Sequence, residues 1–314
     1  MEIGFIGVGN MGAGMANNIH QAGHHLIVND IRRDAAGPFL EAGATWADTP
    51  KQVAEQSEIT FTSLPGPPEM EAVSLSESGV LAGSRPGSVY IDLSTNSPTL
   101  VRRIYQIFKE QGLDMLDAPV SGGVTGARTG LLAIMVGGDE AVYQRVKPVL
   151  DAFGDNVVYC GDIGTGSICK LVHNSISAIT SQAISELFTL GAKAGADLKA
   201  MWETTRRGSF GRNSGGIHRL PGDWFSGNFE ADWDKGFFAT KLMRKDVGLA
   251  TQLAREFDVP MSLANLAEQE LVEAINRGWG DNPTTIVRLL QEERAGLQLR
   301  SDFPAGTTRL VIED

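Results

Sequence analysis

The stretch that decides the fold stands at the start of the chain and reads Ile3-Gly4-Phe5-Ile6-Gly7-Val8-Gly9-Asn10-Met11-Gly12. It is a G-x-G-x-x-G motif that follows an apolar run and opens a segment of helical period. In such a motif Gly7 permits a tight turn, Gly9 lets the backbone approach a pyrophosphate, and Gly12 allows close helix packing, while the helix N-terminus attracts the anion. The motif predicts dinucleotide binding, with an ordinary glycine-rich turn as the alternative.

A carboxylate stands where the adenosine ribose of a dinucleotide would lie. Asp30 ends the next apolar run, 18 residues after Gly12, and a carboxylate there accepts hydrogen bonds from both ribose hydroxyls. A free 2′-hydroxyl suits this carboxylate, whereas a 2′-phosphate would bring a second anion beside it. The sequence therefore favours NAD over NADP. Arg32 and Arg33 leave NADP open, with surface arginines at a helix start as the simpler interpretation.

Short apolar runs alternate with segments of helical period from residue 1 to about 160, which is typical of strand and helix units in a parallel sheet. The runs are almost continuously hydrophobic, as in strands buried on both faces. The expected strands are Ile3–Ile6, Leu26–Asp30, Ile59–Leu64, Val89–Leu93, Met115–Val120, Leu132–Val136 and Val157–Cys160. The expected helices between them are 12–21, 34–41, 50–56, 68–75, 98–111 and 141–152.

The pattern changes after Gly161–Gly166, where a long apolar helix is expected to run to about Ala194. A helix of roughly 28 residues spans about 42 Å, longer than one small helical domain usually covers, so a shared subunit interface is the expected cover. Further helices are expected over 239–257, 263–277 and 283–298, after a loop-rich region at 206–236. We therefore divide the chain into residues 1–162, an all-helical domain at 163–298 and a polar tail at 299–314.

Composition limits the function classes. A chain of 314 residues with 42% hydrophobic and 21% charged side chains is typical of a folded protein of about two domains. Its 27 Lys and Arg against 38 Asp and Glu give a net charge of −11, which disfavours nucleic acid and membrane surfaces as partners. A small anionic substrate remains compatible, because a local site can be positive on a negative protein.

The two cysteines, Cys160 and Cys169, have no metal-ligand spacing, so we expect no metal site and interpret both as small buried hydrophobes in a reducing compartment. The N-terminus has no basic leader, and no run of 18 apolar residues occurs. A cytoplasmic location is the resulting expectation.

Three polar clusters fall where expected strands end, which is where ligands bind in open α/β sheets. They are Ser63–Gly66, Asp92–Pro98 and Asp117–Gly123. The second is also explained as a helix cap, since Ser or Thr before Pro starts helices well. In the third, Ser121-Gly122-Gly123 frees consecutive backbone N–H groups to form an anion-binding nest. This run predicts a carboxylate-binding site.

Lys170 and Asn174 lie four residues apart near the start of the long helix, so both project from one face, with His173 on the flank. We expect the pKa of Lys170 to be depressed, because apolar neighbours and the positive helix end both disfavour an ammonium. A lysine with such a pKa is suited to acid/base catalysis. The alternative is a lysine that extends from a packed helix to solvent.

Taken together, these residues resemble the 3-hydroxyisobutyrate dehydrogenase family, also called β-hydroxyacid dehydrogenases. The resemblance runs from residue 1 to about 298 and rests on GFIGVGNMGAGMA, DLSTNSPT, DAPVSGGVTGARTGLLAIMVGG, GTGSICKLVHN, and Phe238 through KLMRKDVGLA. It implies a Rossmann-type, doubly wound, mostly parallel sheet followed by an all-α domain. It also implies NAD or NADP as cofactor, homodimers or homotetramers that share the long helix, and reversible oxidation of a 3-hydroxy acid.

The resemblance also implies roles for single residues. Lys170 would be the catalytic acid/base and Asn174 would orient the substrate, while Ser121, Gly122 and Gly123 would hold its carboxylate. The residues that would bind the cofactor are Gly7, Gly9, Asn10, Met11, Gly12, Asp30, Leu64, Pro65, Thr95 and Lys245. Of these, Leu64, Pro65 and Thr95 would line the nicotinamide side, and Lys245 would close over the cofactor.

Two departures limit the transfer. The pair His173-Asn174 is similar to 6-phosphogluconate dehydrogenases, but those place a glutamate seven residues after the lysine, where this chain has Ser177. Phosphogluconate chemistry is therefore disfavoured. Arg206, Arg207 and Arg212 are more arginines than a small neutral substrate tail requires, so one of them could bind a second anionic group; solvent-facing arginines are the alternative.

We expect a nicotinamide-dependent dehydrogenase that acts on a small β-hydroxy carboxylate, such as 3-hydroxyisobutyrate, or on the matching semialdehyde in reverse. The alternatives are a non-catalytic dinucleotide-binding scaffold or sensor, and an imine reductase. Both would be expected to lack the lysine that this chain has at position 170. The sequence leaves the exact substrate, the physiological direction and the choice between dimer and tetramer open.

Overall fold

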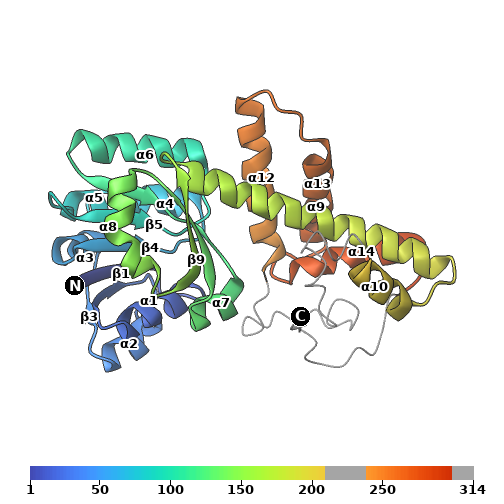
Figure 1. Ribbon diagram of the computed structural model, residues 1–314, viewed down its shortest axis with the longest axis horizontal. Helices are drawn as coiled ribbons and strands as arrows, with labels where there is room; N and C mark the ends of the chain where they lie inside the picture. Colours follow the sequence, from blue (N-terminus) through green and yellow to red (C-terminus); the bar gives the residue numbers. More distant parts are fainter. Residues whose placement is uncertain (209–237, 299–314) are drawn as a thin grey trace. The chain divides into compact units, whose positions relative to one another are not determined.

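The computed structural model describes residues 1–208 and 238–298, which form two compact units (Figure 1). The first unit comprises Met1–Val172 together with Arg255–Phe257, and the second comprises the other described residues. The long helix α9 (Thr165–Lys193) begins in the first unit and continues into the second.

The first unit is built on a nine-stranded sheet with the order β3-β2-β1-β4-β5-β6-β8-β7, in which β9 pairs with β8. Neighbours from β3 to β6 are parallel, β8 is antiparallel to β6 and β7, and β9 is parallel to β8. The strands are β1 (Glu2–Ile6), β2 (His25–Asn29), β3 (Thr45–Trp46), β4 (Ile59–Thr62), β5 (Val89–Asp92), β6 (Asp114–Asp117), β7 (Val120–Ser121), β8 (Leu132–Gly137) and β9 (Gly154–Gly161). The expected doubly wound, mostly parallel sheet is confirmed.

Alternate side chains of each central strand enter different cores. In β2, Leu26 and Val28 belong to one buried cluster and Ile27 to another, as period-two geometry requires. The first cluster is covered by α1 (Gly12–Gln21), α2 (Gly37–Glu41), α7 (Gly123–Thr129) and α8 (Glu140–Leu150). The second is covered by α3 (Pro50–Gln56), α4 (Pro67–Leu75), α5 (Val80–Gly83) and α6 (Pro98–Glu110), so helices lie on both faces (Figure 1). Burial on both faces explains the almost continuous apolar runs.

The strand and helix predictions differ from the structure where elements are short. The two-residue strand β3 was not expected, because two residues are too few to show an alternation. The expected strand Met115–Val120 is divided, since β6 ends at Asp117 and β7 begins after Pro119, which lacks a backbone N–H. The expected helix at 34–41 is a 3₁₀ turn, η1 (Arg33–Ala36), followed by α2.

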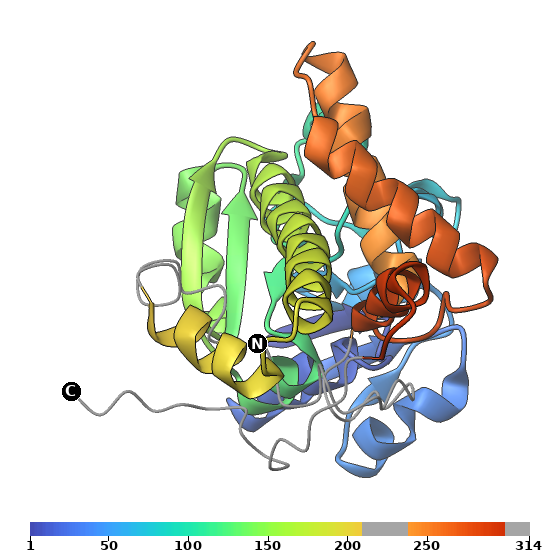
Figure 2. The ribbon, with the colours of Figure 1, turned by 90° about the vertical axis from the view of Figure 1, so that its right-hand side faces the viewer.

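The described part of the second unit is helical, as predicted (Figure 2). After α9 come α10 (Leu198–Arg207), α12 (Thr240–Glu256), α13 (Ser262–Asn276), the 3₁₀ turn η5 (Thr284–Val287) and α14 (Arg288–Ala295). Their shared core draws most of its side chains from α12, α13 and the η5–α14 segment. Helix α10 was not predicted. Most of the expected loop region at 206–236 and the expected polar tail at 299–314 lie outside the described residues.

The prediction that both cysteines are buried is wrong. Cys169 is exposed on α9, and Cys160 is half-buried on β9, a strand that pairs with β8 alone. Within the described ranges, no group of three or more His, Cys, Asp or Glu side chains is arranged to hold a metal ion. Of the helices that the structure describes, none combines the length and the apolar character needed to cross a membrane.

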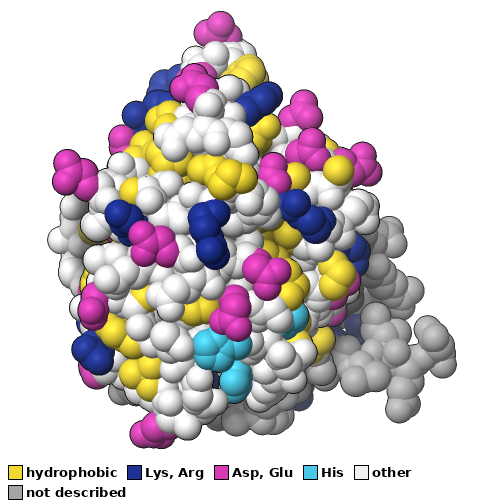
Figure 3. All heavy atoms as spheres, turned by 90° about the vertical axis from the view of Figure 1, so that its left-hand side faces the viewer, with side chains coloured by type: hydrophobic (Ala, Val, Ile, Leu, Met, Phe, Trp, Pro, Cys, Tyr) yellow, Lys and Arg dark blue, Asp and Glu magenta, His cyan; other side chains and the backbone are white. Residues whose placement is uncertain are grey.

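Charged side chains of both signs are interspersed on the face drawn in Figure 3. There, Asp and Glu side chains lie next to Lys and Arg side chains rather than in a separate zone. On the face drawn in Figure 3, the described acidic side chains thus form no single acidic patch.

Candidate active site

The turn between β1 and α1 requires glycine at two positions and leaves space at the third. Gly7 has φ +89°, and a Cβ there would lie 2.3 Å from the carbonyl oxygen of Ser63. A Cβ on Gly12 would lie 1.9 Å from the carbonyl oxygen of Gly7, whereas one on Gly9 would meet nothing within 4 Å. No side chain caps α1, and of its first N–H groups that of Ala13 donates to the Gly9 carbonyl at 2.9 Å, so no side chain competes with an anion for the helix start. The turn therefore fits the pyrophosphate of a dinucleotide.

Asp30 directly follows β2 and is held beside this turn. Its Oδ2 accepts a hydrogen bond from the Val8 N–H at 2.9 Å, and its Oδ1 accepts one from the Arg32 N–H at 2.9 Å. The carboxylate is only partly buried, and its remaining acceptor capacity suits ribose hydroxyls. The Arg33 guanidinium lies over the Trp46 ring, 5.2 Å from its centroid. Asp30 and the turn thus form one continuous surface suited to an adenosine diphosphate.

The loops after β4 and β5 are joined to each other. These strands are parallel and in register, with Thr62 opposite Asp92, so both chains leave the sheet at the same edge. The N–H of Leu64 donates to the Ser94 Oγ at 2.8 Å. Leu64 and Pro65 are thereby held beside the segment that contains Thr95. The structure thus joins Leu64 to Ser94, the neighbour of Thr95 in the sequence.

The run Ser121-Gly122-Gly123 lies between β7 and α7. Gly122 has φ +145° and Gly123 has φ +65°, and a Cβ on Gly122 would lie 2.8 Å from a methyl of Leu132. Side chains other than glycine's hydrogen would be strained at both positions. Ser121 pairs with Ala133 of β8 and remains partly exposed. The local backbone is thus specific to this glycine pair.

A buried carboxylate from β6 holds the start of α9. Asp117 accepts hydrogen bonds from the Gly164 N–H at 2.7 Å and from the Ser167 N–H and hydroxyl at 2.7 and 2.8 Å. Burial raises the pKa of Asp117, and these donors partly oppose that rise. An acidic side chain thus lies at the start of α9, where the sequence alone indicated only the positive end of the helix. Lys170, on the next turn, is buried and only 7% exposed.

Asn174 lies one turn after Lys170 on α9 and is also buried. Its Nδ2 donates to the Asp246 Oδ2 of α12 at 2.5 Å, and the Lys245 Nζ lies 3.1 Å from the Asp246 Oδ1. Asp246 is 1% exposed. One buried carboxylate therefore contacts two predicted site residues, Asn174 and Lys245.

The three arginines noted in the sequence as possible binders of a second anionic group differ in their surroundings. Arg206 and Arg207 belong to the last turn of α10, and both pair with Glu203 at 3.0 Å. Arg206 is largely buried, whereas Arg207 is exposed. Arg212 lies outside the described residues.

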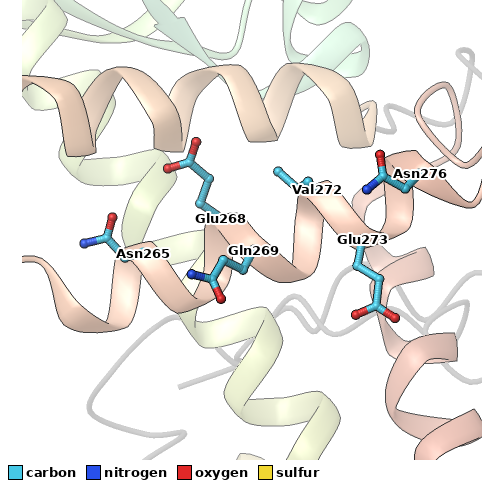
Figure 4. Close-up of a pocket in the computed structure, with 6 residues that line it drawn as sticks. All are labelled: Asn265, Glu268, Gln269, Val272, Glu273 and Asn276. Carbon is cyan, nitrogen blue, oxygen red and sulfur yellow. The ribbon is translucent and has the colours of Figure 1, made fainter.

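A hollow of about 350 Å³ lies along α13 (Figure 4). Its lining residues are Asn265, Glu268, Gln269, Val272, Glu273 and Asn276. In Figure 4 Glu268 points toward the neighbouring helix, and it accepts a hydrogen bond from the Thr251 hydroxyl at 3.0 Å. None of the predicted site residues lines this hollow, so we do not assign the active site to it.

Sequence reasoning assigned no role to three buried carboxylates: Asp92, Asp117 and Asp246. Asp246 could have been found from local pattern. It falls on the inward face of α12 that also carries the buried Met243 and Ala250, three and four residues away. A carboxylate on the apolar face of an amphipathic helix indicates a specific partner, since buried charges are seldom left unpaired.

Two protein-family models match the chain over nearly its whole described length. Residues 2–161 match the NAD binding domain of 6-phosphogluconate dehydrogenase, and residues 164–290 match the model described as NAD-binding of NADP-dependent 3-hydroxyisobutyrate dehydrogenase.

Similar proteins match this chain over most of its length and of their own. A probable mitochondrial 3-hydroxyisobutyrate dehydrogenase of Dictyostelium discoideum is 35% identical over 91% of this chain and 89% of its own length. A 2-hydroxy-3-oxopropionate reductase of Escherichia coli is 38% identical over 93% and 97%. The 3-hydroxyisobutyrate dehydrogenase of Mycobacterium tuberculosis, solved with L-serine, has a TM-score of 0.80 at 28% identity and covers 92% of this chain and 98% of its own. The chain therefore belongs to the 3-hydroxyisobutyrate dehydrogenase family and is a nicotinamide-dependent dehydrogenase that acts on CH–OH groups.

Proposed function

We propose that this protein interconverts a small β-hydroxy carboxylate and its semialdehyde, with Lys170 as the acid/base and NAD as the preferred cofactor. The observation that carries the proposal is the burial of Lys170 one helical turn before the buried Asn174. Lysine is almost never buried without a specific reason, and acid/base catalysis near neutral pH is such a reason.

In this proposal, Lys170 accepts and donates one proton. In the oxidation direction, its neutral Nζ accepts the proton of the substrate hydroxyl; in the reduction direction, the ammonium returns it to the carbonyl oxygen. The nicotinamide, when bound, accepts or supplies the hydride. Proton transfer by a positioned side chain accelerates such a reaction by about 10²- to 10⁴-fold.

The other residues orient the substrate. Asn174 is fixed by its 2.5 Å hydrogen bond to Asp246, which leaves its amide oxygen for the substrate hydroxyl or the lysine. The backbone N–H groups at Ser121, Gly122 and Gly123 would bind the substrate carboxylate. An anchored carboxylate and an oriented hydroxyl together define which hydrogen is transferred.

The preference for NAD rests on Asp30. Its carboxylate is fixed by the Val8 and Arg32 N–H groups, and a 2′-phosphate placed there would meet a negative charge. The engagement of Arg33 with Trp46 supports the same preference, since that guanidinium already has an aromatic partner.

We also propose that α9 forms part of a homodimer or homotetramer interface. Along this helix Val172, Ile176, Leu187 and Leu190 are 54 to 65% exposed. Their spacing places them along one side of the helix, and such an apolar stripe is typical of subunit interfaces.

Replacing Lys170 with alanine tests the catalytic proposal. With a panel of short hydroxy acids and NAD, followed through NADH absorbance, Lys170→Ala is expected to lower kcat by about 10²- to 10⁴-fold while the Kd for NADH changes little. Lys199→Ala, at an exposed position on α10, is the matched control and should behave as wild type. Wild-type turnover by Lys170→Ala would remove Lys170 from the mechanism.

A further inference from the structure

A chain of buried polar side chains runs beneath the loops after β4 and β5. It starts at Ser74 on α4, whose hydroxyl lies 2.9 Å from the Tyr90 hydroxyl, and Tyr90 lies 3.1 Å from the Thr62 hydroxyl. Thr62 donates to the Asp92 Oδ1 at 2.8 Å. All four side chains are buried, with exposed fractions of 0 to 2%. Side chains hidden from water in this way are held by their partners alone.

The direction of the hydrogen bonds follows from the number of hydrogens. The single hydroxyl hydrogen of Thr62 is used on Asp92, so the Tyr90 hydroxyl must donate to Thr62. The Tyr90 hydrogen is then used as well, so Ser74 must donate to Tyr90. From Ser74 through Tyr90 and Thr62, every hydroxyl therefore donates in the direction of Asp92.

A second group of hydrogen bonds reaches Asp92 from the loops after β4 and β5. The Ser94 hydroxyl donates to the Asp92 Oδ1 at 2.7 Å and accepts from the Leu64 N–H at 2.8 Å. The Asn96 Nδ2 donates to the Asp92 Oδ2 at 2.6 Å. One buried carboxylate is therefore the common acceptor for strand β4, for the loop after β5 and, through Ser94, for the loop after β4.

Donors on both oxygens favour the ionised form of this acceptor. With the Asn96 amide as it stands, a protonated Oδ2 would place its own hydrogen against the Asn96 Nδ2 donor. Burial raises the pKa of Asp92 to about 6, against hydrogen bonds from Ser94, Thr62 and Asn96 that lower it. At neutral pH the group is a carboxylate.

We infer that Asp92 and Ser94 are positioning residues that set the relative placement of the two loops at the nicotinamide end of the cofactor. The inference rests on the proposed roles of Leu64, Pro65 and Thr95 on the nicotinamide side. Neither residue needs to touch the cofactor, because Ser94 acts through the backbone of Leu64 and Asp92 acts through Ser94 and Asn96.

The test compares two buried serines. Ser94→Ala removes the link between the loops, whereas Ser74→Ala removes a hydroxyl from the far end of the same chain and leaves both loops intact. The Kd values of NADH and of ADP-ribose are measured for each variant. ADP-ribose lacks the nicotinamide ring, so its Kd reports only on the glycine-rich turn and Asp30.

Ser94→Ala is expected to raise the ratio of the NADH Kd to the ADP-ribose Kd about tenfold, because the partly buried Leu64 N–H loses the acceptor that fixes its loop. Ser74→Ala should leave that ratio within about twofold of wild type, and Ser94→Thr, which keeps a hydroxyl, should restore it. A ratio unchanged in Ser94→Ala, or raised equally in both alanine variants, overturns the inference even if wild type binds NADH and turns over. A wild-type protein that binds neither ligand overturns the proposed function together with the inference.

Asp92→Asn provides a second measurement that does not depend on removing the loop link. The Asn96 side-chain oxygen is buried and has no hydrogen-bond partner within the described structure, so a flip of that amide lets it accept from the new amide nitrogen. The variant is therefore expected to fold and to bind ADP-ribose as wild type does, while the NADH ratio rises severalfold. An unchanged ratio in this variant would count against a role for the charge.

Discussion

Replacing Asp117 with alanine is expected to destabilise the first unit far more than loss of an ordinary helix cap. Asp117 is 1% exposed and accepts three hydrogen bonds from Gly164 and Ser167 at the start of α9. Its removal leaves two buried backbone N–H groups without acceptors, at about 1 to 3 kcal/mol each. The buried carboxylate also carries its own desolvation cost, which the variant no longer has. With that cost subtracted, the net loss should be about 3 kcal/mol.

The matched control is Asp139→Ala. Asp139 caps α8 in the same chemical way, by accepting from the Ala141 and Val142 N–H groups at 2.8 and 3.1 Å, but it does so at an exposed position. Water can replace that carboxylate, so the loss should be about 1 kcal/mol.

Calorimetry distinguishes the two variants. For a domain of this size each kcal/mol lowers Tm by about 2 to 4 °C, so Asp117→Ala should lose about 10 °C and Asp139→Ala about 3 °C. Because Lys170 lies on the next turn of α9, kcat of Asp117→Ala should also fall at a temperature where the variant is folded. Equal losses of Tm in the two variants would refute the reasoning that burial makes the Asp117 cap different.

Three further predictions follow from the same contacts. Asp30→Ala should raise KM for NAD about tenfold or more and leave KM for NADP nearly unchanged, as steady-state kinetics with both cofactors will show; a preference of wild type for NADP would contradict the assignment. The raised pKa of Asp92, about 6 against 3.8, means that the native state binds this proton more tightly than the unfolded state, so stability falls as pH rises from about 4 to about 6. Urea denaturation across that range should show a decline of about 3 kcal/mol from this group in wild type that is absent in Asp92→Asn, and equal declines would contradict it. Charges placed on the α9 stripe by Ile176→Asp with Leu187→Asp should lower the mass measured by light scattering to that of a monomer, whereas a monomeric wild type would remove the proposed interface.

Local pattern was sufficient for much of the fold and part of the site. Gly7, Gly9 and Gly12 occur within six residues, so their motif can be read from the sequence, although the contact that excludes a side chain at Gly7 comes from the distant Ser63. The four-residue spacing of Lys170 and Asn174 places both on one face of any helix that contains them. These features could be predicted from the sequence because a strand or helix period is expressed within a few neighbouring residues.

The roles of the buried carboxylates could not be predicted from local pattern, since their partners come from distant parts of the chain. Asp117 meets Ser167 across 50 residues, and Asn174 meets Asp246 across 72. Asp92 gains Thr62, 30 residues away, because β4 and β5 are neighbours in register. A polar residue that follows a strand looks the same in a sequence whether it faces water or a buried partner.

The amino-acid sequence alone determined the order of the longer strands and of most helices, the dinucleotide turn and the spacing of Lys170 and Asn174, because each is expressed within a few neighbouring residues. Only the tertiary structure decided which carboxylates are buried, what they hold in place and that Cys169 faces outward. The physical reason is that burial and long-range hydrogen bonds depend on which elements become neighbours, and no local period records that.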